Sequence, residues 1–236
     1  MNNKIRQAMV LAAGRGERLR PLTDQCPKPL LKVKNKPLLI HHLERLSHAG
    51  FERIVINLGW LGEQIPPLVA EYQTTKNLAS VEIIFSQEPQ GALETAGGIR
   101  HALHHFDQQP FALISADVLT DLDYSALSTQ TLKHLAHLFL VANPPHHPEG
   151  DFRLGHDGVL LPKEANTKNP ALTYSGLGVF DPTLFAPLAP GHRPLRPVLD
   201  QAINHQQVTG HSLTGHWLDI GTTERLDEAE SATWLV

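Results

Sequence analysis

Short β-rich segments alternate with helical patterns through the first half of the chain, and this alternation constrains the fold more than any other feature. Leu39, Leu43 and Leu46 fall on one helical face, and Gly50 is placed to end that helix. Strands that alternate with helices form βαβ units and a largely parallel sheet. We therefore expect a doubly wound α/β fold with a mainly parallel, mixed sheet, its first strands being Ala8–Ala12, Arg53–Leu58, Val81–Ser86 and Phe111–Ser115.

The second half has shorter strands that are separated by prolines. Its expected strands are Leu135–Asn143, Phe152–Leu154, Val159–Leu161, Leu172–Phe180 and Val208–Leu213. Further helices are expected at Leu61–Tyr72, where two prolines disturb the pattern, and at Thr95–Phe106, Arg196–His205 and Thr222–Leu235. At 236 residues the chain has the length of one α/β domain, so we expect a single domain over residues 1–236.

The charge composition excludes some classes of partner. A formal net charge of -4 argues against a protein that mainly binds nucleic acid or an anionic membrane. A cationic cluster nevertheless occurs early in the chain, which suits a small polyanionic ligand: Arg15, Arg18, Arg20, Lys28, Lys32 and Lys34.

The single cysteine, Cys26, cannot form an intramolecular disulfide, which favours a reducing compartment. No secretory pattern opens the sequence, and no window approaches the roughly 20 apolar residues of a membrane helix. We expect a cytoplasmic location. The 15 histidines do not indicate a zinc site, because adjacent pairs such as His41 and His42 cannot face one way on a helix. Most of them are expected to be solvated.

Small residues follow the first expected strand, in Leu11-Ala12-Ala13-Gly14-Arg15-Gly16. Such residues let backbone N–H groups approach phosphates closely, and nearby cations add charge neutralisation. A dinucleotide fingerprint would need a third glycine where Leu19 stands, and a P-loop would need Gly-Lys-Ser/Thr. The two glycines alone fit a simple tight turn equally well.

Two aspartates stand where carboxylates can bind a metal. Asp117 follows the strand Phe111–Ser115, and Asp219 precedes a helix start at Thr222. Either could instead be a turn or cap residue. Phosphoryl transfer commonly uses Mg²⁺ held by one or two carboxylates and the substrate phosphates, so this pair is a candidate site.

The longer string Leu-Ala-Ala-Gly-x-Gly-x-Arg-Leu-x-Pro-Leu-Thr, followed by Pro-Lys-Pro-Leu, resembles the signature of the sugar-1-phosphate nucleotidyltransferase family. The resemblance implies a Rossmann-like fold, with residues 1–130 mainly binding nucleotide and residues 131–236 mainly binding sugar. It also implies catalytic roles at the phosphates for Arg18 and Lys28. The loop that wraps the triphosphate would consist of Leu11, Ala12, Ala13, Gly14 and Gly16.

The same resemblance covers the aspartates, because relatives carry a Gly-Asp pair and a late Trp-x-Asp-x-Gly-Thr segment. It implies that Asp117 and Asp219 coordinate Mg²⁺. This chain reads Ser115-Ala116-Asp117 where Asn-Gly-Asp is commoner. Alanine is tolerated there only if its φ is negative, so the departure bears on the local backbone.

Residues 87–99 are similar to the Leu-Gly-Thr-Ala-Gly segment with which relatives hold base and ribose, except that Glu94 replaces a glycine. The Leu-Glu-Thr-x-Gly-Gly form resembles the N-acetylmuramate-1-phosphate uridylyltransferase branch. Nucleotide contacts are implied for Gln87, Glu88, Glu94, Thr95, Gly97 and Gly98. Sugar contacts are implied for Asn143, Asp151, Ser175 and Gly176, although polar residues beside prolines are also ordinary turn formers.

The implied reaction transfers a nucleotidyl group, expected from UTP, to a sugar-1-phosphate, expected to be N-acetylmuramate-1-phosphate, in cell-wall recycling. Glucose-1-phosphate with dTTP and mannose-1-phosphate with GTP are alternatives within the same chemistry. A catalytically silent regulatory protein is the alternative of another class. Because the sequence ends soon after Asp219, without the extension through which many relatives assemble, we expect a monomer.

Overall fold

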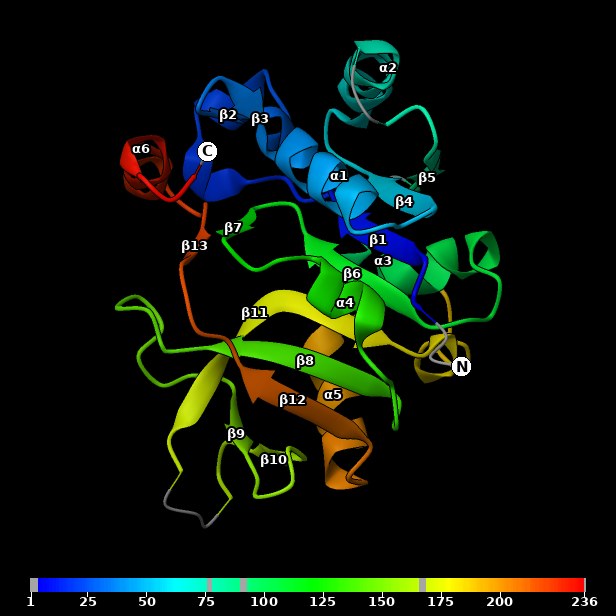
Figure 1. Ribbon diagram of the computed structural model, residues 1–236, viewed down its shortest axis with the longest axis vertical. Coiled ribbons are helices and arrows are strands. Elements are labelled where there is room, and N and C mark those ends of the chain that lie inside the picture. Colours follow the sequence, from blue (N-terminus) through cyan, green and yellow to red (C-terminus); the bar gives the residue numbers. More distant parts are fainter. Residues whose placement is uncertain (1–3, 76–77, 90–92, 166–168, 236) are drawn as a thin grey trace.

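The computed structural model describes residues 4–75, 78–89, 93–165 and 169–235. In these residues nine strands form one mixed sheet (Figure 1). Its parallel part has the order β6-β1-β4-β5, formed by Phe111–Ser115, Gln7–Leu11, Arg53–Leu58 and Glu82–Gln87. β11 (Ala171–Phe180) runs antiparallel to β6 and connects the parallel part to the second half of the sheet. There it pairs with β8 (Ala136–Val141) and β9 (Phe152–Leu154), which in turn pair with β12 (Val208–Ser212) and β10 (Leu160–Pro162).

Helices cover both faces of the sheet because the strands are apolar on both sides. In β1, Ala8 and Val10 join the core cluster beneath α1 (Leu38–His48), α2 (Ile65–Thr75) and α4 (Ser125–Thr129). Met9 points the other way, into the cluster shared with α3 (Glu94–Ala102) and α5 (Leu195–Asn204). Alternation along a strand places successive side chains on opposite faces. The expected α/β architecture is confirmed.

The expected helix after residue 61 forms in spite of its prolines. Pro66 and Pro67 stand in the first turn of α2, where a missing N–H breaks no intrahelical bond. The sequence predicts no bounds for five short elements. These are β2 (Lys32–Val33), β3 (Lys36–Pro37), α4, β7 (Val118–Thr120) and β13 (Trp217–Asp219).

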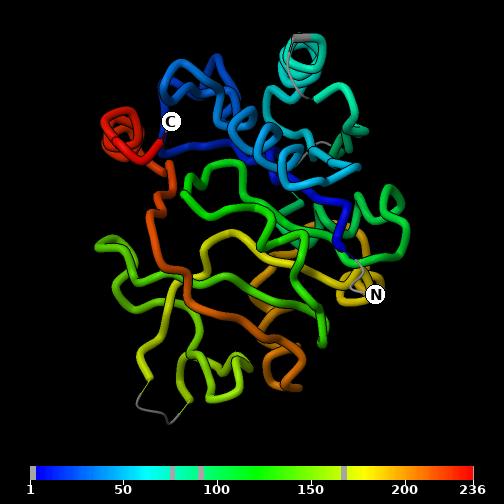
Figure 2. The backbone as a smooth tube through the Cα atoms, in the orientation of Figure 1, coloured from blue at the N-terminus to red at the C-terminus, as the bar shows by residue number. Residues whose placement is uncertain are grey.

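The end of the described chain returns to the loop that follows β1. Figure 2 shows the C-terminal helix α6 (Thr223–Ser231) lying beside the β2–β3 hairpin. A third apolar cluster joins these parts and includes Leu19, Leu119 and Ile220. The Thr222 side chain caps α6 by accepting from the backbone N of Arg225 at 3.4 Å, as the sequence predicts. Among the described residues, none of the helices combines the length and apolarity required to span a membrane.

Two histidines of α1 depart from the expected solvation. His42 is fully buried, and His41 is 8% exposed. His41 Nε2 lies 3.0 Å from the backbone oxygen of Val33. Burial lowers the pKa of His41, so the neutral ring is a packed core residue with a backbone partner.

Candidate active site

The loop Leu11–Gly16, called the glycine loop from here on, lines a cavity of about 380 Å³ at the carboxyl end of β1. Ala12 N donates to Asn57 Oδ1 at 2.7 Å, which ties the start of the loop to β4. Gly16 has a φ of +66°, in the region that favours glycine. A Cβ added to Gly14 would meet nothing within 4 Å. Packing therefore does not require a glycine at position 14, and the missing side chain keeps the cavity open.

The cations of the loop occupy different places. The Lys28 side chain is 14% exposed and forms an ion pair with Asp117, so it joins the loop to the end of β6. Arg18 lines an adjoining cavity of about 620 Å³ and has no ion-pair partner in the part of the chain that the structure describes. Arg15 is held by Asp24 at 2.5 Å and stacks over Trp60. Lys28 and Arg18 thus line two adjoining cavities.

Asp117 and Asp219 lie at the same end of the β7–β13 ladder. Asp219 pairs with Val118, and Ile220 N donates to the backbone oxygen of Asp117 at 2.7 Å. Both aspartates line the 620 Å³ cavity, with side chains 35% and 21% exposed. Two acids that are 102 positions apart in sequence therefore face one cavity, on the same edge of the sheet as the glycine loop.

Each aspartate is balanced by basic groups. Asp117 faces Lys28, and Asp219 Oδ1 lies 2.5 Å from Arg225 Nη1 and 3.0 Å from His146 Nε2. Among the described residues no group of three or more His, Cys, Asp or Glu side chains could hold a metal. Mg²⁺ commonly takes one or two carboxylates and completes its shell with substrate phosphates and water. The two carboxylates fit that kind of site.

The local backbone accepts the alanine that replaces the commoner glycine. Ala116 is not among the described residues with positive φ. Its backbone oxygen lies 3.3 Å from Nε2 of the buried His42, whose Nδ1 lies 2.7 Å from Tyr124 Oη. Burial lowers the pKa of His42 to about 3 and raises the pKa of Tyr124 to about 12. A neutral buried pair therefore supports the turn that carries Asp117.

Three of the predicted nucleotide residues line the smaller cavity beyond the glycine loop. Glu88, Glu94 and Thr95 do so, and Glu88 Oε1 accepts from Asn57 Nδ2 at 2.7 Å. Glu94 has a φ of +60°, in the region that favours glycine. Asn57 was not predicted, since a single asparagine at the end of a strand carries no pattern.

Three other predicted nucleotide residues lie outside both cavities. Gln87 is exposed, and its amide donates to the backbone oxygen of Leu58 at 3.3 Å. A Cβ on Gly98 would come within 2.5 Å of Glu88 Oε1, and one on Gly97 within 2.3 Å of Gly191 O. Both glycines allow α3 to pack closely, which is a structural reason for their presence.

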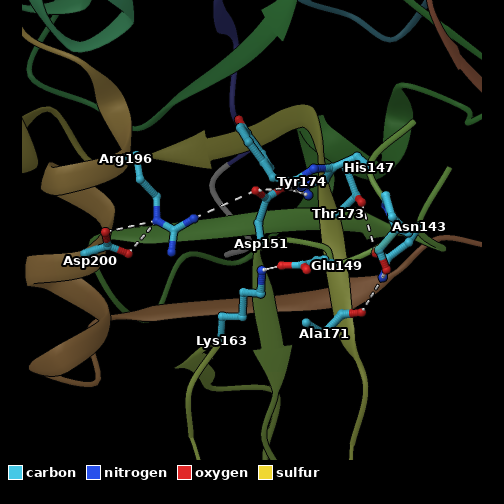
Figure 3. A network of polar contacts seen from close by, with 11 residues as sticks. Asn143, His147, Glu149, Asp151, Lys163, Ala171, Thr173, Tyr174, Arg196 and Asp200 are labelled. Atoms are coloured by element: carbon cyan, nitrogen blue, oxygen red, sulfur yellow. Dashed lines mark hydrogen bonds and ion pairs between the residues drawn. The ribbon is translucent and has the colours of Figure 1, made fainter. Parts of the chain in front are cut away.

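The predicted sugar residues also divide. Ser175 and Gly176 line the 620 Å³ cavity where the register of β11 shifts, and Ser175 O accepts from Trp217 Nε1 at 2.9 Å. Asp151 lines it too. Asn143 does not: its amide nitrogen donates to Pro148 O at 2.9 Å and to Ala171 O at 3.0 Å, so it closes a loop (Figure 3).

A separate cavity of about 590 Å³ lies at the opposite edge of the sheet. Its arginines are already paired, Arg6 with Glu52 and Arg53 with Glu82. None of the predicted site residues lines it. The candidate site therefore lies at the carboxyl ends of β1 and β6, where open α/β sheets bind ligands.

Comparison with known proteins agrees with this geometry. Residues 7–153 match the family described as "Nucleotidyl transferase". The chain is 48% identical over 231 residues to an N-acetylmuramate alpha-1-phosphate uridylyltransferase from Neisseria meningitidis serogroup B, covering 95% of this chain and 97% of the relative. A protein of the same name from Caulobacter vibrioides is 31% identical over 240 residues, 98% of each chain. The structure of a UDP-glucose pyrophosphorylase complexed with UDP-glucose shares the fold, with a TM-score of 0.78 at 19% identity over 96% of this chain and 97% of that chain. The chain belongs to the nucleotidyl transferase family, as its motifs predict.

Proposed function

We propose that this protein transfers the uridylyl group of UTP to N-acetylmuramate-1-phosphate, giving UDP-N-acetylmuramate and pyrophosphate. The substrate assignment is supported by the relative from Neisseria meningitidis, which is similar over nearly the whole of both chains. The chemistry is supported by one observation above the others. Lys28 contacts Asp117, and Asp117 lines the same cavity as Asp219, which pairs with the next residue, Val118.

In this proposal the two halves of the chain bind the two substrates. The triphosphate of UTP lies along Leu11–Gly16, where backbone N–H groups and Lys28 neutralise its charge. The sugar phosphate occupies the 620 Å³ cavity, whose volume suits a ligand of this size. Arg18 lines that cavity without an ion-pair partner in the described chain, so it is available to the phosphates.

The reaction needs orientation and charge neutralisation more than proton transfer. An oxygen of the sugar phosphate attacks the α-phosphorus of UTP in line, and pyrophosphate leaves. A phosphate dianion is already a nucleophile, so no general base is required. Asp117 and Asp219 would hold Mg²⁺, which supplies neutralisation of charge on the reacting phosphates. Lys28 and Arg18 offset the charge that grows on the leaving pyrophosphate.

A substrate panel tests the assignment. Pyrophosphate release is measured for UTP, dTTP and GTP, each with N-acetylmuramate-1-phosphate, glucose-1-phosphate and mannose-1-phosphate. The highest kcat/KM is expected for UTP with N-acetylmuramate-1-phosphate. A preference for another pair would contradict the substrate assignment, and no turnover with any pair would support a silent regulatory protein.

The metal assignment has its own test. Asp117→Asn and Asp219→Asn are each expected to lower kcat by about 100-fold or more, because several kcal/mol of charge stabilisation depend on the metal. Electron paramagnetic resonance of Mn²⁺ added to the protein gives a second readout, in which both variants should bind Mn²⁺ more weakly than the parent protein. Unchanged Mn²⁺ binding would contradict the assignment. The monomeric state and the cytoplasmic location stay predictions, the first open to light scattering.

A further inference from the structure

Arg196 is a cation in the large cavity that the proposed chemistry does not use. It stands in the first turn of α5 and lines the same 620 Å³ cavity as Asp117 and Asp219. Its guanidinium lies over the ring of Phe152, 4.8 Å from the ring centre. Phe152 belongs to β9, whereas Asp117 follows β6, and β11 lies between these two strands. Two strand spacings separate the positions by roughly 10 Å, which is about the reach of a substituted sugar beyond its phosphate.

The guanidinium is held in place but keeps donors free. Arg196 Nε donates to both carboxylate oxygens of Asp200, at 2.7 and 2.9 Å. Nη1 lies 3.8 Å from Asp151 Oδ1, beyond hydrogen-bond distance (Figure 3). Within the described ranges the Nη groups therefore have no hydrogen-bond partner. A fixed guanidinium with two free terminal nitrogens suits a carboxylate, which it can bind in a bidentate manner.

Asp151 acts as a support for this cation. Its Oδ2 accepts from Tyr174 N at 2.9 Å, and its Oδ1 lies 3.1 Å from His147 Nε2. Both oxygens are thus already engaged with the protein. Asp151 therefore organises His147 and Arg196 at the cavity wall, and the basic side chains are the ones with donors left for a ligand.

We propose that Arg196, with His147 beside it, binds the lactyl carboxylate of N-acetylmuramate-1-phosphate and selects this sugar phosphate over those that lack the acid. N-acetylmuramate is N-acetylglucosamine with a lactyl ether, so the carboxylate is the group that separates the two. The positive end of α5 adds to the charge of the guanidinium. The inference rests on the proposed function, because it assigns a subsite for the acceptor named there.

The test compares two acceptors in three proteins. With UTP, kcat/KM is measured for N-acetylmuramate-1-phosphate and N-acetylglucosamine-1-phosphate in the parent protein, Arg196→Gln and Arg193→Gln. Arg193 is the matched control, because it precedes the same helix, is exposed and lines neither cavity. Arg196→Gln is expected to lower kcat/KM for the muramate about 10- to 100-fold, mainly through KM, since hydrogen bonds to charged groups are the strong ones. For the glucosamine derivative, Arg196→Gln should leave kcat/KM within about 2-fold of the parent value. Arg193→Gln should change kcat/KM for neither acceptor.

The outcomes separate this inference from the proposed function. Suppose that the parent protein uses the muramate and that Arg196→Gln lowers kcat/KM equally for both acceptors, or for neither. The carboxylate subsite is then wrong, while the proposed function stands. If the parent protein does not use the muramate, both are wrong. Arg196→Lys keeps the charge but loses the planar fork, so a partial loss confined to the muramate supports the subsite even if the glutamine variant folds poorly.

Discussion

His42 is expected to make the folded protein sensitive to acid. Its ring is 0% exposed, and both ring nitrogens are engaged, one with Tyr124 Oη and one with the backbone oxygen of Ala116. This arrangement suits a neutral ring that donates from Nε2 and accepts at Nδ1. Protonation would place a second donor against the tyrosine hydroxyl and a charge in an apolar core. Burial accordingly lowers the pKa of His42 to about 3 from an ordinary value of 6.5.

The size of the effect follows from these two values. The folded pKa is lowered, so the unfolded chain binds the proton more readily than the folded chain does. The stabilisation is therefore complete above about pH 6.5 and is lost as the pH falls toward 3. Each pH unit in that window costs about 1.4 kcal/mol, so at pH 5 His42 alone lowers the free energy of unfolding by about 2 kcal/mol.

Urea denaturation at pH 7.5 and pH 5 measures this loss. His42→Gln removes the titrating group but keeps an amide donor and acceptor in the core. The parent protein should lose about 2 kcal/mol more than this variant between the two pH values. His48→Gln is the control, because His48 is exposed at the end of the same helix and should follow the parent protein. If the His42 variant and the parent protein lose equal stability, His42 is not the acid-sensitive group and the reasoning fails.

Four further substitutions separate effects on folding from effects on substrate binding and catalysis. Gly14→Val should leave the melting temperature almost unchanged, because a Cβ there meets nothing, but it should weaken UTP binding measured by calorimetry. Gly98→Ala should lower the free energy of unfolding in urea by about 1–3 kcal/mol, because its Cβ would crowd the buried carboxylate of Glu88. Glu94→Gly should raise the free energy of unfolding by up to about 1 kcal/mol in the same assay, since its φ is +60°. Lys28→Met should lower kcat/KM about 100-fold or more with an unchanged circular dichroism spectrum, because it removes a cation from the phosphates.

The parallel strands could be predicted because burial on both faces makes each one a short, dense apolar run. β1, β4 and β6 lie within one or two residues of their predicted bounds. No bounds were predicted for β7 and β13, although β9, which also has three residues, was predicted with its observed bounds. Yet the two aspartates that line one cavity lie at the end of this short ladder. The strand pattern predicted the sheet and made the two aspartates candidates, and the family motif selected them.

The supporting residues of the site have no signature because their contacts join distant parts of the chain. Asn57 holds Ala12 N and Glu88, which are 45 and 31 positions away. His42 reaches the oxygen of Ala116 across 74 positions. A buried asparagine or histidine becomes functional only when the fold brings a partner to it. The sequence alone therefore favoured a solvated His42.

Membership of a motif did not guarantee a place in the cavity, and the difference lies in what each side chain would touch. Gly98 belongs to the predicted nucleotide segment, but the carboxylate of Glu88 packs so closely against it that no side chain would fit there. Gly14 has no such neighbour, so only something that enters the cavity could require a glycine there. Asn143 and Asp151 differ in the same way. The Asn143 amide hydrogen-bonds to the backbone of its own loop region, whereas Asp151 holds basic groups at the cavity wall. A motif residue is therefore best assigned to ligand binding when the folded protein itself leaves it unused.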